Sequence, residues 1–255
     1  MSSWGTRRRN LILTIFFSGI FVIVAVNVAR FLQTEATCFD GIQNQGELGI
    51  DCGGPCDLMC SQQIAPPVVK WTRFFQVAGG AYNAVAYIEN QNPDAKSDPI
   101  RYKFTLRDDR GAVLADRIGT IEMRPSEVIP VFAESMNTGA MSPARMDFEI
   151  LNLNEVDWYK ATQRTPYIVV THEELSYPNL TPNISARIEN TGFRTLKDIY
   201  IVVIVYNEED NAIGVSRTYV DEILSNQRKN ILFTWPQDFS DPVSRFEIIP
   251  LYETD

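Results

Sequence analysis

Histidine is the residue type that this sequence nearly lacks: the 255 residues contain only His172. A lone imidazole has no second histidine with which to share a metal ion, and no glycine-rich phosphate loop or nucleophile elbow occurs elsewhere in the chain. The adjacent acidic pairs, Asp108 with Asp109 and Glu208 with Glu209, fall in predicted turns, where solvated carboxylates are common. We therefore predict a non-catalytic protein and interpret His172 as a solvated surface residue.

Charged residues are absent from Leu11 to Ala29, a run of 19 residues. A helix of this length rises ~1.5 Å per residue and spans roughly 28 Å, close to the ~30 Å hydrocarbon core of a bilayer. The alternative is a cleaved signal peptide, whose apolar region is about 7 to 15 residues long and ends in small residues. Because this run is longer and "NVARFLQTEATC" offers no such cleavage site, we predict an uncleaved transmembrane signal anchor over residues 11–32.

Basic residues are distributed unevenly about this span. Arg7, Arg8 and Arg9 precede it and a single arginine follows, so the positive-inside rule predicts a cytoplasmic N-terminus at residues 1–10 and an extracytoplasmic C-terminus. Four of the 23 basic residues lie in residues 1–32, which leaves 19 against 32 acidic residues, a formal charge of −13, for residues 33–255. Such an acidic chain is poorly suited to nucleic acid or an anionic lipid surface. We predict a single-pass protein of the cell membrane with no nucleic-acid partner.

Cysteine is absent outside one stretch, "CFDGIQNQGELGIDCGGPCDLMC" (residues 38–60), which also contains no Lys or Arg. Thiols oxidise outside the cytoplasm, so Cys38, Cys52, Cys56 and Cys60 predict two disulfides. Four cysteines allow three pairings, and all three remain open. A zinc site is the alternative, but such sites more often contain a C-x-x-C pair or nearby histidines.

Oxygen ligands in the same stretch raise a second possibility. Asp40, Asn44, Glu47 and Asp51 are spaced so that they could converge on a calcium ion, which takes several oxygen ligands. The alternating ligands of an EF-hand loop are missing. The other interpretation is an acidic loop whose Asp and Asn side chains cap turns, and it is the one we favour.

The stretch as a whole resembles a cysteine-rich motif, C-x-DG-x-x-N-x-x-E-x-x-x-DCGG-x-C, found on secreted and surface proteins of bacteria. The resemblance covers roughly a tenth of the chain. It implies an extracytoplasmic spacer, and we assign residues 33–61 to a cysteine-rich acidic stalk.

An internal repeat divides the rest of the chain. After the proline-bearing linker "SQQIAPP", "AYIEN" at 86–90 recurs as "ARIEN" at 186–190, and "DDRGAV" at 108–113 is matched by "NEEDNAI" at 207–213. "FEI" at 148–150 also returns as "FEI" at 246–248. Three matches in the same order at a nearly constant offset predict two domains, residues 67–160 and residues 164–255.

Both predicted domains have the period of β-strands. Tyr102, Phe104 and Leu106 alternate with polar residues, as do the apolar residues of 184–188. "IYIVVIVY" (199–206) is apolar throughout and β-branched, which predicts a strand buried on both faces or at an interface. Turn signals separate these runs, and no helical stripe follows the membrane span. The pattern predicts antiparallel β-sandwiches.

The run "FTLRD" (104–108), with Gly111 and the later "RPSE" turn, resembles the FxLYD domain, an immunoglobulin-like sandwich of bacterial surface proteins. The second copy, "VIVYN" (203–207), keeps the aromatic residue but has valines in place of Phe and Leu. The resemblance implies two tandem immunoglobulin-like sandwiches and a surface setting. We therefore expect an all-β ectodomain, after one transmembrane helix and a small disulfide-rich segment, that acts as an interaction or scaffold protein of the bacterial envelope with a protein partner. The alternative is an accessory subunit of a larger envelope assembly, such as a secretion or appendage complex.

Overall fold

The computed structural model describes residues 4–33, 37–162, 167–178 and 181–252. The chain is mostly β-strand after one N-terminal helix, as the sequence predicts. It forms two compact units, Met1–Cys60 and Ser61–Asp255, which are described separately below.

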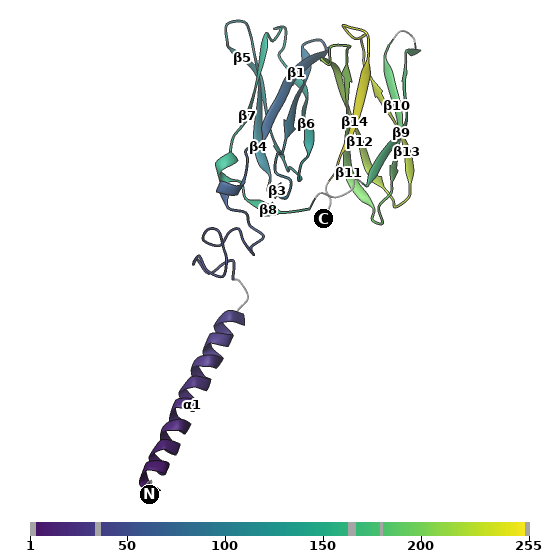
Figure 1. The fold of residues 1–255 in the computed structure, drawn as a ribbon. Helices are drawn as coiled ribbons and strands as arrows, with labels where there is room; N and C mark the ends of the chain where they lie inside the picture. The colour runs from purple at the N-terminus through teal and green to yellow at the C-terminus, as the bar shows by residue number, and fades with distance from the viewer. Residues whose placement is uncertain (1–3, 34–36, 163–166, 179–180, 253–255) are drawn as a thin grey trace. The chain divides into compact units, whose positions relative to one another are not determined.

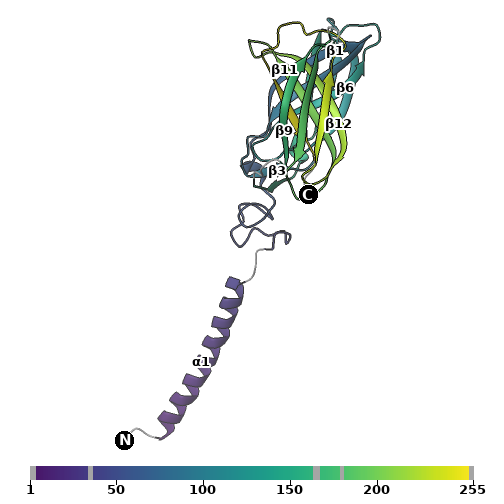
Figure 2. The same cartoon turned by 90° about the vertical axis from the view of Figure 1, so that its right-hand side faces the viewer.

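The first unit begins with a long apolar helix, α1 (Trp4–Gln33), which is drawn at the N-terminus in Figures 1 and 2. Its segment Arg7–Arg30 is long and apolar enough to cross a membrane, by length and composition. Two polar side chains turn back on the helix: Thr14 Oγ1 donates to Asn10 O (2.9 Å) and Asn27 Nδ2 donates to Ile23 O (2.8 Å). Because lipid offers no hydrogen-bond partners, such internal bonds lower the cost of placing these groups in a bilayer.

The second unit starts with a 3₁₀ turn, η1 (Ser61–Gln63), and continues as antiparallel strands. One three-stranded sheet has the order β1-β2-β6, a second has the order β5-β4-β7, and β3 pairs with β8. The bounds are β1 Val68–Ala78, β2 Ala81–Glu89, β3 Ala95–Ser97, β4 Ile100–Arg107, β5 Val113–Ile121, β6 Val128–Asn137, β7 Arg145–Ile150 and β8 Trp158–Lys160, with a 3₁₀ turn, η2, at Leu153–Glu155. We call these strands the first sandwich.

The same strand order returns in the second half of this unit. One sheet has the order β9-β10-β13 and the other β12-β11-β14. The bounds are β9 Ile168–Ser176, β10 Asn183–Asn190, β11 Leu196–Tyr206, β12 Ala212–Ile223, β13 Arg228–Thr234 and β14 Arg245–Leu251. We call these strands the second sandwich.

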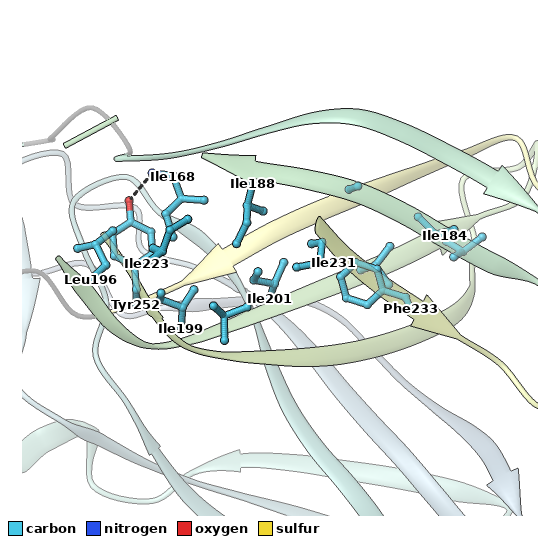
Figure 3. Close-up of a cluster of buried hydrophobic side chains, with 14 residues drawn as sticks. Ile168, Ile184, Ile188, Leu196, Ile199, Ile201, Ile223, Ile231, Phe233 and Tyr252 are labelled. Atoms are coloured by element: carbon cyan, nitrogen blue, oxygen red, sulfur yellow. Dashed lines mark hydrogen bonds between the residues drawn. The ribbon is translucent and has the colours of Figure 1, made fainter. Parts of the chain in front are cut away.

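The core of the second sandwich lies between its two sheets (Figure 3). Alternate residues of β10 are buried, and Ile184 and Ile188 meet Ile199 and Ile201 of β11. The phenol of Tyr252 enters the same cluster, where its hydroxyl accepts hydrogen bonds from the backbone N–H of Tyr167 (2.7 Å) and of Ile168 (3.4 Å). A buried hydroxyl with such partners avoids the desolvation cost of an unpaired polar group.

Two buried asparagines have the same role in the two sandwiches. Asn90 directly follows β2, Asn190 is the last residue of β10, and both are fully buried. Asn90 Nδ2 donates to the carbonyls of Ala95 (2.8 Å) and Arg124 (2.7 Å), and its Oδ1 accepts from the N–H two residues on. Asn190 does the same with Arg194 O (2.7 Å), Ile223 O (3.0 Å) and the N–H of Gly192 (2.9 Å). Each side chain thereby joins two loops at one end of its sandwich.

The turns that begin with Asp108 and Asn207 also match. In each turn the first residue donates its N–H to the carbonyl four residues on (both 3.0 Å), and its side-chain Oδ1 accepts from the N–H of that same residue, at 2.7 and 2.9 Å. The third proposed match, between the two "FEI" runs, is wrong by two residues. Since Phe104 pairs with Phe148 and its counterpart Val203 pairs with Ile248, the counterpart of Phe148 is Ile248.

The two sandwiches pack against each other through their inner sheets, so the layers follow the order β5-β4-β7, β1-β2-β6, β12-β11-β14 and β9-β10-β13 (Figure 1). Strand β11 lies in the middle. Val203 and Val205 face the core of the second sandwich, whereas Val202 and Ile204 pack in a separate cluster with Val85 of the first. The prediction that residues 199–206 form a strand buried on both faces or at an interface is confirmed.

Candidate interaction sites

The cysteine-rich segment contains the two predicted disulfides. Cys38 is bonded to Cys56 and Cys52 to Cys60, with Cα–Cα distances of 5.6 and 5.1 Å. The pairing that the sequence left open is therefore first with third and second with fourth, so that the two closed loops overlap. Gly54 lies at φ +56, and a Cβ there would come within 2.0 Å of the Gly46 carbonyl oxygen. The close crossing of the two chain segments requires glycine at this position.

Asp40 and Asp51 accept hydrogen bonds within the loop. The Asp51 carboxylate accepts from the backbone N–H of Asp40 (3.0 Å) and of Gly41 (3.0 and 3.1 Å). Asp40 accepts from Thr37 Oγ1, Asn44 Nδ2 and the backbone N–H of the residue two positions on. These bonds, that from Thr37 first, lower the pKa of Asp40 because they stabilise its charged form.

Glu47 is the buried acidic residue of the segment, with 6% of its surface exposed. Its Oε2 accepts from the backbone N–H of Asn44 (3.4 Å) and Asp51 (3.3 Å), and its Oε1 lies 3.2 Å from the Sγ of Cys56. That sulfur belongs to a disulfide and carries no proton, so the last contact is packing. Glu47 thus connects the loop backbone to the Cys38–Cys56 bridge.

The four residues proposed as calcium ligands lie in one loop, but their oxygens are not arranged around a common point. Within the described ranges, the one group of three potential metal ligands within 4.8 Å is Cys38, Glu47 and Cys56, whose sulfurs are bonded to each other. Asn44 turns its amide nitrogen toward Asp40, while its buried Oδ1 has no partner. As they lie, these side chains cap turns, which is the interpretation favoured from the sequence, and calcium binding stays the alternative hypothesis.

The histidine and the acidic pairs that the sequence raised as possible catalytic groups lie in turns or on the surface. His172 is exposed in β9, where its φ of 55° marks a bulge, and its Nδ1 lies 3.1 Å from Thr171 Oγ1. Asp109, Glu208 and Glu209 are exposed in the two matching turns. Exposed residues of this kind lack the burial that tunes catalytic groups.

Aromatic residues gather where the two sandwiches meet. The ring of Trp71 (β1) lies 5.2 Å from that of Tyr87 (β2) and 6.5 Å from that of Tyr206 (β11). Both tyrosine hydroxyls donate to the same oxygen, Glu247 Oε2, at 3.3 and 3.1 Å. Burial, together with the neighbouring Glu247 carboxylate, raises the pKa of Tyr87 to about 12 and raises that of Tyr206 as well. One carboxylate on β14 therefore ties a tyrosine of each sandwich.

Arg217 of β12 connects the sandwiches at a second place. Its guanidinium forms an ion pair with Glu134 (2.9 Å) and lies over the rings of Phe132 (5.1 Å) and Tyr200 (4.6 Å). Glu134 and Phe132 belong to the first sandwich and Tyr200 to the second. Because the ion pair is partly exposed, packing against the two rings contributes much of the contact.

The sequence did not reveal this interface in residue detail. The one sequence signal for the interface was the unbroken apolar run at 199–206, which predicted that both faces of the strand are packed against other residues. The residues of the first sandwich that pack near this strand, such as Trp71 and Tyr87, lie more than a hundred positions away and belong to no motif.

No family model matches the chain, and no curated protein is found to be similar to it. Among solved structures, a transglutaminase from red sea bream is 8% identical, with 74% of this chain and 31% of that chain covered and a TM-score of 0.27. A β-glucuronidase from glycoside hydrolase family 2 is 11% identical (86% and 29% covered, TM-score 0.24), and one from Ruminococcus gnavus is 10% identical (68% and 36% covered, TM-score 0.16). The chain spans about a third of the length of these enzymes, and similarity at this level carries no argument about its activity.

Proposed function

We propose that this chain is a membrane-anchored, non-catalytic interaction or scaffold protein on the outer side of a bacterial cell membrane. The observation that supports it most is the order of features along the first unit: a membrane-length apolar helix is followed within a few residues by two disulfides. Disulfides persist in oxidising compartments, so this order favours an extracytoplasmic segment held by its helix.

Three further features support the role. Arg7, Arg8 and Arg9 precede the helix, which favours a cytoplasmic N-terminus. The residues that follow carry a formal charge of −13, since 19 basic residues oppose 32 acidic ones. The resemblances to the cysteine-rich surface motif and to FxLYD domains imply a surface setting, with loops and sheet edges available for a protein partner.

Limited proteolysis of spheroplasts tests the topology. With a tag at each end, proteinase K added from outside should remove the C-terminal tag and leave a short fragment that contains α1 and the N-terminal tag. Opening the membrane with detergent should then expose the N-terminal tag, which is the control. A C-terminal tag that survives in intact spheroplasts would contradict the proposed orientation.

A further inference from the structure

A cavity of ≈ 220 Å³ lies where the two sandwiches meet at one end of their interface. Trp71 and Arg73 of β1 line one side, and the turn Asp210, Asn211 and Ala212 of the second sandwich lines the other. Pockets for drug-sized ligands hold about 300–1,000 Å³, so this one suits a single ring-sized unit.

The lining combines an aromatic wall with both signs of charge. Trp71 is half-buried, whereas Arg73 on the same strand and Asp210 and Asn211 on the facing turn are exposed at the mouth of this open pocket. A ligand with net charge would meet a repelling group on one wall. A neutral ligand with several hydroxyls can accept from Arg73, donate to Asp210, and do both with the Asn211 amide.

The turn that supplies Asp210 is held in place. Its N–H donates to Asn207 O (3.2 Å), and the N–H of Asn211 donates to Asn207 Oδ1 (2.9 Å). Asp210 Oδ1 accepts from Arg245 Nε (2.8 Å), and the Arg245 guanidinium lies 3.8 Å above the Tyr206 ring. The second carboxylate oxygen keeps its capacity to accept, and a preorganised carboxylate costs less to engage than a mobile one.

The identity of residue 210 is informative because the first sandwich has the same turn. There the corresponding residue is Gly111, at φ +89, with an N–H bond of 3.2 Å to Asp108 O. Asp210 adopts φ +62, a left-handed conformation that glycine takes without strain and that Asp takes more readily than most other L-residues. The second turn thus has a carboxylate, bonded to Arg245, where the first turn has glycine, and this is the turn that lines the pocket.

We infer that this cavity binds one sugar residue of a neutral saccharide. The C–H face of the ring packs on Trp71, and its hydroxyls bond to Arg73, Asp210 and Asn211. This assignment gives a ligand class to the interaction role proposed above and rests on that role. Membrane topology and saccharide binding are measured independently, so either can fail alone.

The test uses the full chain in phosphatidylcholine nanodiscs prepared without glycoside detergents, which would compete for the site. The chain has four tryptophans, so 5-fluorotryptophan labelling gives four ¹⁹F resonances, and Trp71→Phe identifies that of Trp71. The probes are soluble tri- to hexasaccharides of glucose, N-acetylglucosamine, mannose and galactose. We expect at least one to shift the Trp71 resonance saturably and to leave the other three in place.

Two substitutions and one matched control locate the site. Asp210→Gly copies the turn of the first sandwich and should weaken binding by about tenfold or more, and Asn211→Ala should weaken it as well. Asp109→Gly, the same change in the turn without the cavity, should leave the affinity unchanged.

Equal unfolding midpoints in denaturant show that each variant is folded, and Asn211→Ala serves if Asp210→Gly fails this check. No saturable shift with any saccharide at millimolar concentration would overturn the assignment, as would full binding by both cavity variants. A Trp71 shift with peptides but not with saccharides would make this a peptide site and equally overturn it.

Discussion

At the scale of single residues, one buried polar side chain holds loops together through hydrogen bonds to their backbone. Asn190 uses both amide hydrogens and its oxygen on three backbone groups of the second sandwich. The sequence repeat drew attention to this residue through the shared "IEN" run, but it gave no reason for the asparagine. The reason is structural, since only a side chain with donors and an acceptor can satisfy that end of the sandwich.

Asn190→Ala should lower the free energy of unfolding by ~2–3 kcal/mol, because it leaves buried backbone groups without partners. Asn230→Ala is the control: Asn230 is exposed on β13 and accepts one bond of 3.3 Å from Arg187, so the change should stay within about 0.5 kcal/mol. Urea unfolding of the full chain measures both. Equal effects would mean that the buried asparagine has no special role.

The tyrosines bound to Glu247 predict a loss of stability at high pH. An unperturbed tyrosine has a pKa of about 10, whereas that of Tyr87 is raised to about 12 in the folded chain. Between these values the unfolded chain loses the proton and the folded chain keeps it. Stability is therefore fully present below about pH 10 and declines as the pH rises toward 12. The free energy of unfolding of the Tyr87→Phe variant should decline less over this pH interval than that of the unaltered chain, with unfolding followed by circular dichroism. Parallel curves for the two proteins would contradict the assignment of Tyr87 to a buried interface.

The acidic residues of the cysteine-rich segment predict the outcome of a calcium titration. Asp40 and Asp51 already accept hydrogen bonds from within the loop, and Glu47 is buried beside a disulfide. We expect no saturable heat when CaCl₂ is added to the oxidised full chain in a calorimeter. Binding heat that is lost in both Asp40→Asn and Asp51→Asn would show that the loop rearranges into the calcium site.

At the scale of elements, sequence periodicity predicted what depends on local pattern. Alternation in 101–107 and 184–188 predicted β4 and β10, and the uncharged run predicted α1, because burial on one face or in lipid imposes those patterns. The pairing of strands is a different matter. The "FEI" runs look alike but differ by two residues in register, since a shift of two keeps the same face of a strand buried and leaves the pattern unchanged.

The cysteine-rich segment should respond to reduction without affecting the sandwiches, because residues 61–255 contain no cysteine. Reductant should change the free energy of unfolding of the sandwiches by no more than about 0.5 kcal/mol. Tryptophan fluorescence reports it, since Trp71, Trp158 and Trp235 all lie in residues 61–255. Residues 38–60 contain no Lys or Arg, so trypsin does not report on them. Cleavage by endoproteinase Glu-C after the buried Glu47 should appear only in the reduced protein. Unfolding of the sandwiches on reduction would show that the segment is part of their core.

At the scale of the whole molecule, the sequence predicted two similar β domains but not their association. Val202 and Ile204 are fully buried by contact with the first sandwich. Removing an aliphatic side chain of this size from water is worth about 1.5–3 kcal/mol, so the interface is a substantial part of the stability of residues 61–255. The residues of the first sandwich that bury Val202 and Ile204 lie far away in sequence. The local pattern therefore indicated that both faces of the strand are buried, but not which residues bury them.

The central claim is that an uncleaved helix holds an oxidised segment outside the cytoplasm, and the intact mass of the protein from native membranes tests it most directly. Thiols are blocked at lysis, and the mass is recorded without reductant. Two disulfides remove two hydrogens each, so we predict the mass of a chain that begins near Met1, less four hydrogens, with no blocked thiol. A chain that begins between Ala29 and Cys38, or one with four blocked cysteines, would contradict the account.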